Sequence, residues 1–206
     1  MRQRIIHITQ GLVSMSAIAI VYFSAQGHTK QCAEAVAEGA RSVEGCSVIL
    51  HRITEADFSQ GNGRWKNDAV IEQLNAADAI VLGTPTYMGG YSAQLKAFID
   101  ACAGIWFKQG WRDKVAAGFT HSQGLSGDKV TTLVGLMINA MQHGMVWVGM
   151  GMLPEGSSTK DRNRLSAYAG AMAQSDMQQE QVHQADLETM KLLGERVAKT
   201  AARWNK

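Results

Sequence analysis

The chain has 206 residues, of which 46% are hydrophobic and 18% charged, and its net charge is +2 at neutral pH. This size and composition are those of a globular protein with a full hydrophobic core. The charges form no basic run and no basic stripe interleaved with aromatics, so we do not expect nucleic acid as a partner. The three cysteines, Cys32, Cys46 and Cys102, include no C-x-x-C pair, which argues against a disulfide framework and favours a cytoplasmic location.

The N-terminal residues superficially resemble a signal peptide, because Met1-Arg2-Gln3-Arg4 precedes a partly apolar stretch. Polar residues interrupt that stretch at His7, Thr9 and Gln10. We therefore expect a poorly ordered extension over residues 1–14 and a single domain over residues 15–206. No apolar run approaches the length of a membrane span, so none is expected.

Five short apolar runs alternate with amphipathic segments along the chain. This βαβ pattern predicts an α/β fold with a mostly parallel sheet and helices on both faces. The expected strands cover residues 17–23, 47–53, 79–84, 115–120 and 145–149. Apolar residues at helical spacing mark helices around Val36, Phe98, Leu133 and Leu193, and the last of these helices is expected to close the sheet.

The first strand runs directly into a short turn that carries Ser24, Gly27 and Thr29, and then into a helix. The start of a helix has unpaired backbone N–H groups and a partial positive charge, so it attracts oxyanions. Serine and threonine add hydroxyl donors, and glycine lets the backbone approach the anion closely. This junction predicts a phosphate site, although an N-capped helix after a buried strand has the same pattern.

Two common phosphate loops are absent from this chain. It lacks G-x-x-x-x-G-K-[ST], which binds nucleoside triphosphates, and G-x-G-x-x-G, which binds dinucleotides. The second strand ends in Arg52-Ile53-Thr54 and so offers no acidic residue to a ribose. A ligand with a single terminal phosphate fits the loop best.

Two further segments leave the same edge of the expected sheet, namely residues 85–90 and 120–124. In the first, a proline turn, an aromatic residue and two glycines would let a flat ring lie against exposed backbone groups. A plain Pro/Gly turn before a helix is the alternative. Gly90-Tyr91-Ser92 is similar to a serine-hydrolase elbow, but Gln94 replaces its last glycine and no ordered Asp and His partners follow.

Two stretches are unusual for connecting loops. Residues 104–113 place Trp106, Phe107 and Trp111 in a loop, where they either meet a ligand or second subunit or fold back onto their own helix. Residues 150–181 form a long, weakly periodic stretch rich in Gly, Ser, Met and Gln, and loops of that length are usually functional or disordered.

From about Ala17 onward the chain resembles the flavodoxin-like FMN-binding proteins, and within them the WrbA-type NAD(P)H:quinone oxidoreductases. The matching residues are Tyr22, Ser24, Gly27 and His28 in the phosphate loop, Gly83-Thr84-Pro85-Thr86, Gly89 and Ala93-Gln94-Leu95-Lys96 in the ring loop and its helix, and Gly104-Ile105-Trp106-Phe107-Lys108, Phe119-Thr120, Thr131-Thr132-Leu133 and His143-Gly144-Met145-Val146-Trp147-Val148-Gly149 further on. The resemblance implies a flavodoxin-like, doubly wound sheet of five parallel strands in the order 2-1-3-4-5.

The resemblance also implies the residues of an FMN site. Ser24, Gln26, Gly27, His28 and Thr29 would hold the phosphate; Pro85, Thr86, Tyr87, Met88, Gly89 and Gly90 would border the isoalloxazine ring; and Thr120, His121, Ser122, Gln123 and Gly124 would cover its pyrimidine side and the ribityl chain. Tyr87 either packs on the ring or covers the loop at the surface. His121 either donates to the pyrimidine carbonyl or bonds nearby backbone.

The implied activity is hydride transfer from NAD(P)H through bound FMN to a quinone or similar acceptor, with the chemistry on the flavin itself. The family often has Arg-Phe where this chain has Tyr87-Met88, and a Gly-Gly-Asp-Gly-Ser loop in the region of residues 169–174, so this chain resembles a divergent branch. An electron carrier that docks to redox proteins is the alternative, but such carriers are typically strongly acidic. We also expect a homodimer or homotetramer and no metal.

Overall fold

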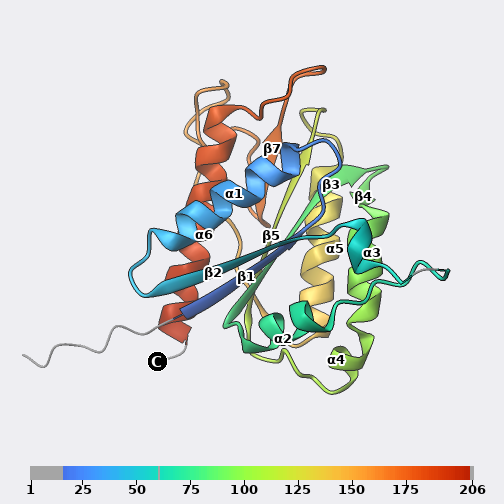
Figure 1. Cartoon of the computed structure of the whole chain (residues 1–206). Helices are drawn as coiled ribbons and strands as arrows, with labels where there is room; N and C mark the ends of the chain where they lie inside the picture. Colours follow the sequence, from blue (N-terminus) through green and yellow to red (C-terminus); the bar gives the residue numbers. More distant parts are fainter. Residues whose placement is uncertain (1–15, 60, 205–206) are drawn as a thin grey trace, which may run out of the picture.

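A computed structural model describes residues 16–59 and 61–204, and its centre is a parallel β-sheet (Figure 1). The neighbouring strands follow the order β2-β1-β3-β5-β6. Their bounds are Ser16–Tyr22 for β1, Cys46–Arg52 for β2, Ala79–Tyr87 for β3, Val115–Ser122 for β5 and Val146–Trp147 for β6. These are the five expected strands in the expected order, so the predicted flavodoxin-like topology is confirmed. The expected extension over residues 1–14 lies outside the described residues.

The fifth strand position is shared by two short strands. β6 pairs with Val115 and Ala116 of β5, whereas β7, Ala171–Gln174, pairs with the stretch of β5 from Phe119 to Ser122. The chain leaves the sheet after β6 and returns to the same edge more than twenty residues later. The expected loop over residues 150–181 therefore contains a buried strand, and residues 171–174 are not the open loop expected there.

Two of the expected loops also contain strand residues. β3 continues to Tyr87 and forms a tight hairpin with β4, Gly90–Tyr91. The two turn residues, Met88 and Gly89, have φ angles of 47° and 77°. Positive φ at both central residues is typical of a type I′ hairpin turn. In the same way, Thr120, His121 and Ser122 are the last residues of β5 rather than part of a loop.

Helices cover both faces of the sheet (Figure 1). On one face lie α1, His28–Arg41, and α6, Gln184–Trp204; on the other lie α2, Asp68–Ala76, α3, Ala93–Ala101, α4, Ala103–Phe107, and α5, Lys129–Gln142, while a short 3₁₀ helix, Glu55–Asp57, follows β2. Two glycines bring the backbones of α1 and α6 into contact. A Cβ on Gly39 would lie 1.9 Å from the carbonyl oxygen of Lys191, and a Cβ on Gly194 would lie 1.9 Å from the carbonyl oxygen of Val36. α6 thus closes the sheet, as expected.

The aromatic residues expected in a loop before β5 have different environments. Trp106 and Phe107 lie on α4 with 44% and 80% of their surface exposed. Trp111 is only 3% exposed, and its indole N–H donates to Asn75 Oδ1 at 2.8 Å. Trp111 is therefore a core residue packed within its own chain, and of the two alternatives it does not take the one beside a ligand or second subunit. Across residues 16–59 and 61–204, every helix is too short or too polar to cross a lipid bilayer.

Candidate functional site

A cavity of about 290 Å³ lies at the carboxyl ends of β1, β3 and β5. Ligands of open parallel sheets bind at this edge, because the loops there diverge and leave a crevice. All the lining residues but one were predicted as site residues: Ser24, Gln26, His28, Thr29, Pro85, Thr86, Tyr87, His121 and Gln123, with Ala25 in addition. The three segments expected to form one site therefore do meet in space.

The turn between β1 and α1 has the shape of an anion-binding loop. Ser24 Oγ accepts hydrogen bonds from the backbone N–H groups of Gly27 at 3.2 Å and Lys30 at 3.1 Å, which curls the chain around the serine. Gly27 is the N-cap of α1 at a φ of 95°, a left-handed conformation that favours glycine. The loop is thus shaped by its own bonds, and it places the first turn of α1 against the cavity.

Several donors of this turn have no partner in the described part of the chain. They are the backbone N–H groups of Ala25, Gln26, His28 and Thr29 and the hydroxyl of Thr29. Thr29 is buried and lines the cavity. Donors without partners among the described residues, including those of the buried residues His28 and Thr29, lie at the positive end of a helix and are suited to an oxyanion. This end of the cavity therefore fits a phosphate group.

Two stacked histidines form one wall of the cavity. The rings of His28 and His121 lie 4.8 Å apart between centroids and are 6° from parallel. Nε2 of His28 donates to the Gln179 carbonyl at 2.7 Å, and Nε2 of His121 lies 3.0 Å from Ser175 Oγ. Burial, with His28 and Lys129 nearby, lowers the pKa of His121 to about 3. His121 is therefore a neutral imidazole at physiological pH, and both rings tie the segment after β7 to the site.

The floor of the cavity is fixed by a chain of threonine hydroxyls. Thr86 Oγ1 lies 2.8 Å from both Thr120 Oγ1 and Thr132 Oγ1, and Thr120 donates to the Thr84 carbonyl at 2.7 Å. These hydroxyls satisfy one another away from solvent, so the ends of β3 and β5 are held together. Thr120 thus supports the cavity from below rather than lining it.

The remaining predicted residues lie beside the cavity without lining it. Met88, Gly89 and Gly90 form the tip of the β3–β4 hairpin, where Met88 is fully exposed, and only Tyr87 reaches the cavity from this turn. Gly27, Ser122 and Gly124 shape their loops from outside the lining. Ser92, the possible hydrolase nucleophile, is buried, and its Oγ accepts from Leu95 N–H as the N-cap of α3, so it is a capping residue.

A buried polar network that the sequence analysis missed supports the segment after β5. Arg164 binds Asp186 through Nε–Oδ1 and Nη2–Oδ2 contacts of 3.0 and 2.9 Å, and Asp186 also accepts from Gln174 N–H at 2.9 Å. Gln174 in turn donates through Nε2 to the Gln123 carbonyl at 3.0 Å. No local signal identifies this network, because its members come from β7, α6 and the loop before β7.

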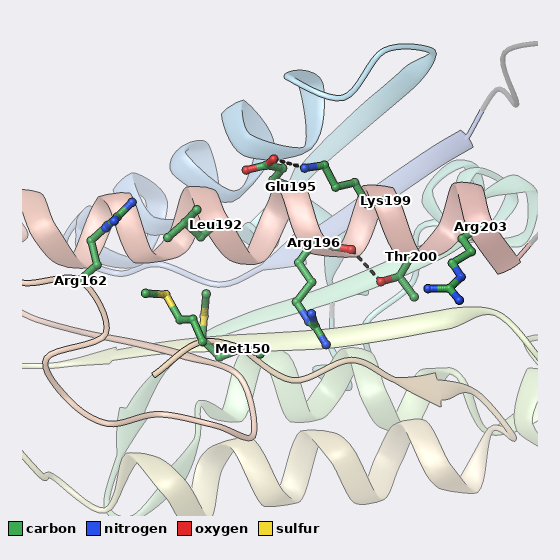
Figure 2. A pocket seen from close by; sticks show the side chains of 10 residues that line it. Met150, Arg162, Leu192, Glu195, Arg196, Lys199, Thr200 and Arg203 are labelled. Atoms are coloured by element: carbon green, nitrogen blue, oxygen red, sulfur yellow. Dashed lines mark hydrogen bonds and ion pairs between the residues drawn. The ribbon is translucent and has the colours of Figure 1, made fainter. Parts of the chain in front are cut away.

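A larger cavity of about 540 Å³ lies elsewhere, along α6 and the segment after β6 (Figure 2). Its lining includes Arg196, whose Nε donates to the Gly149 carbonyl at 3.0 Å, and Lys199, which forms an ion pair with Glu195. None of the predicted site residues lies there. We assign the functional site to the 290 Å³ cavity because donors that have no partner among residues 16–59 and 61–204 converge on it.

The chain is similar to proteins of a known family. Residues 17–163 match the family model described as NADPH-dependent FMN reductase. Flavodoxin FldP of Pseudomonas aeruginosa is 41% identical over 190 residues, which cover 90% of this chain and 96% of that protein. An NAD(P)H dehydrogenase (quinone) of Cupriavidus metallidurans is 35% identical over 196 residues, with 91% and 98% covered.

Among solved structures, a flavodoxin, WrbA-like protein from Agrobacterium tumefaciens superposes with a TM-score of 0.71 at 41% identity, covering 91% of this chain and 98% of that one. The family match spans well over half of the chain, and the two relatives cover nearly all of it. The chain therefore belongs to the NADPH-dependent FMN reductase family, whose flavodoxin-like members are FMN-dependent oxidoreductases.

Proposed function

We propose that the protein is an enzyme that binds FMN in the 290 Å³ cavity and uses it to pass hydride equivalents from NAD(P)H to a quinone. The observation that carries this proposal is the turn before α1, where backbone N–H donors that the described residues leave unpaired lie at the positive end of a helix. Bound FMN supplies the redox chemistry, because its ring accepts a hydride and delivers two electrons.

The residues present fit FMN in three parts. Ser24, Gln26, Gly27, His28 and Thr29 would hold the phosphate, residues 85–90 would border the ring, and residues 120–124 would cover its pyrimidine side. The backbone groups of the hairpin tip and of Gln123 and Gly124 would orient the ring. His121 stays neutral, so it would serve as a hydrogen-bonding group rather than as a cation.

The proposed acceptor is a quinone because relatives that match nearly the whole chain carry the name NAD(P)H dehydrogenase (quinone). The alternative is an electron carrier, favoured by the 41% identity to a flavodoxin. The net charge of +2 supports the enzyme, since flavodoxin-type carriers are typically strongly acidic.

One assay separates these two functions. The FMN-loaded protein is mixed with NADH or NADPH and a soluble benzoquinone, with no other protein present, and nicotinamide oxidation is followed at its absorbance band. Rapid, saturable turnover supports the enzyme. Flavin that takes up electrons only from an added reductase, with no nicotinamide oxidation of its own, would show a carrier instead.

We further propose that copies of the chain associate in the cytoplasm. Trp106 and Phe107 place two aromatic side chains on the exposed side of α4, where a second subunit would cover them. The cysteines Cys32, Cys46 and Cys102 are all unpaired, which suits a reducing compartment. Sedimentation of the FMN-loaded protein tests the association, and a strictly monomeric profile would contradict it.

A further inference from the structure

Lys129 is a buried cation beneath the segment that follows β5. It is the first residue of α5, and only 1% of its surface is exposed. Its Nζ donates to Ser122 Oγ at 2.9 Å, to the Leu125 carbonyl at 3.0 Å and to the Gly124 carbonyl. All three acceptors lie within residues 122–125, so one ammonium group fastens this whole segment.

This placement of a lysine is energetically unfavourable in two ways. A buried ammonium loses its hydration, and the positive end of a helix repels it. Burial accordingly lowers the pKa of Lys129 to about 8. Its three hydrogen-bond partners are neutral oxygens, whereas the nearby carboxylate of Asp186 is bound by Arg164. Within the described residues, the charge of Lys129 has no anion in direct contact.

The bonds of Lys129 determine which groups of the segment can face the cavity. Its ammonium occupies the carbonyl oxygens of Gly124 and Leu125, so these oxygens point toward the helix start rather than toward a ligand. The wrapping is tight, since a Cβ on Gly127 would stand 2.5 Å from Ser122 Oγ. Gln123, between two of the anchored residues, lines the cavity.

We propose that Lys129 is a positioning residue for the flavin: it fixes residues 122–125 against the ring and supplies a buried positive charge that favours the reduced, anionic form. The inference rests on the proposed FMN site. The added electrons of the reduced flavin provide the anion that this charge otherwise lacks, and the low dielectric around Lys129 strengthens their attraction. The charge is thus expected to raise the midpoint potential of the bound flavin.

Three variants separate the charge from the hydrogen bonds. Lys129→Met keeps the length of the side chain but loses both its charge and its donors. Lys129→Gln loses the charge and keeps an N–H donor, and it also provides a folded protein if the methionine variant does not fold. Lys199→Met is the control, because Lys199 is 64% exposed on α6 and lies outside the cavity.

The measurements are the FMN dissociation constant from flavin fluorescence, the midpoint potential of the bound flavin against reference dyes, and the melting temperature of the apoprotein. We expect Lys129→Met to weaken FMN binding by about tenfold or more, because residues 122–125 lose the three hydrogen bonds that hold them in place for the ring. Both Lys129 variants should shift the midpoint potential to more negative values, while Lys199→Met should match the wild type in all three measurements.

A purely structural lysine would lower the melting temperature and the affinity without moving the midpoint potential, and that result would overturn the inference. The inference about Lys129 would also be overturned if both folded variants kept the wild-type FMN affinity and midpoint potential. That result would leave the proposed FMN site intact. Failure of the wild-type protein to bind FMN would instead refute the proposed function, and the role of Lys129 with it.

Discussion

Substitution of Thr29 by valine tests the phosphate end of the site in detail. Thr29 lies in the first turn of α1, is 2% exposed, and lines the cavity with a hydroxyl that has no partner in the described residues. Valine has nearly the same shape and the same branching at Cβ, so the packing around it is retained. The substitution therefore removes one donor and little else.

The size of the effect follows from the charge of the ligand. A hydrogen bond to a charged group contributes about 1.5–3 kcal/mol, which corresponds to a dissociation constant for FMN raised between about tenfold and about 150-fold. Riboflavin lacks the phosphate, so its affinity should not change. The melting temperature of the apoprotein should also stay the same, because the hydroxyl makes no bond within the described protein.

Flavin fluorescence titrations of both proteins give these dissociation constants. Thr200→Val serves as the control, since Thr200 bonds its own helix backbone through the Arg196 carbonyl and does not line the 290 Å³ cavity. Equal FMN affinity for Thr29→Val and the wild type would refute the phosphate assignment. An equal loss for FMN and riboflavin would show that the substitution had disturbed the ring site instead.

Three further predictions concern stability. The pKa of His121 is lowered to about 3 in the folded state, so its neutral form stabilises the apoprotein fully above pH 6.5, and this stabilisation is lost as the pH falls toward 3. In chemical unfolding between these pH values, His121→Gln should therefore lose less free energy of unfolding than the wild type. Met88→Gly should raise the free energy of unfolding by about 0.5–1 kcal/mol, because it relieves a φ of 47° at a fully exposed residue, and a decrease would argue against strain there. Arg164→Met should cost about 3–5 kcal/mol in urea unfolding by leaving Asp186 buried without its partner, whereas a cost below 1 kcal/mol would show that the pair is not stabilising as placed.

The sequence predicted the parts of the site that depend on local patterns. The apolar run of β1, the turn with Ser24 and Gly27, and the amphipathic face of α1 are adjacent in the chain, and they form as expected. The parallel topology then brings the ends of β3 and β5 to the same edge. Strand periodicity and turn chemistry are therefore sufficient to place the cavity.

Other features depend on contacts between distant residues, and the sequence pattern does not reveal them. β7 has four residues, all buried, with no alternation to mark it, and it forms only because β5 has an unpaired edge beyond β6. From its sequence position alone, Lys129 would be expected at the surface with its amine in solvent. Its burial is explained only by the carbonyl groups that accept from it in the folded chain. Trp111, in the turn after α4, can be buried because Asn75 of α2 accepts its N–H.

Titration of the purified apoprotein with FMN and, separately, with riboflavin tests the central claim most directly. If the turn before α1 binds a phosphate, FMN should bind at one per chain and at least about 100-fold more tightly than riboflavin, since several charge-assisted hydrogen bonds depend on that group. Equal affinity for the two flavins, or no binding of FMN, would contradict the phosphate site and the redox function based on it.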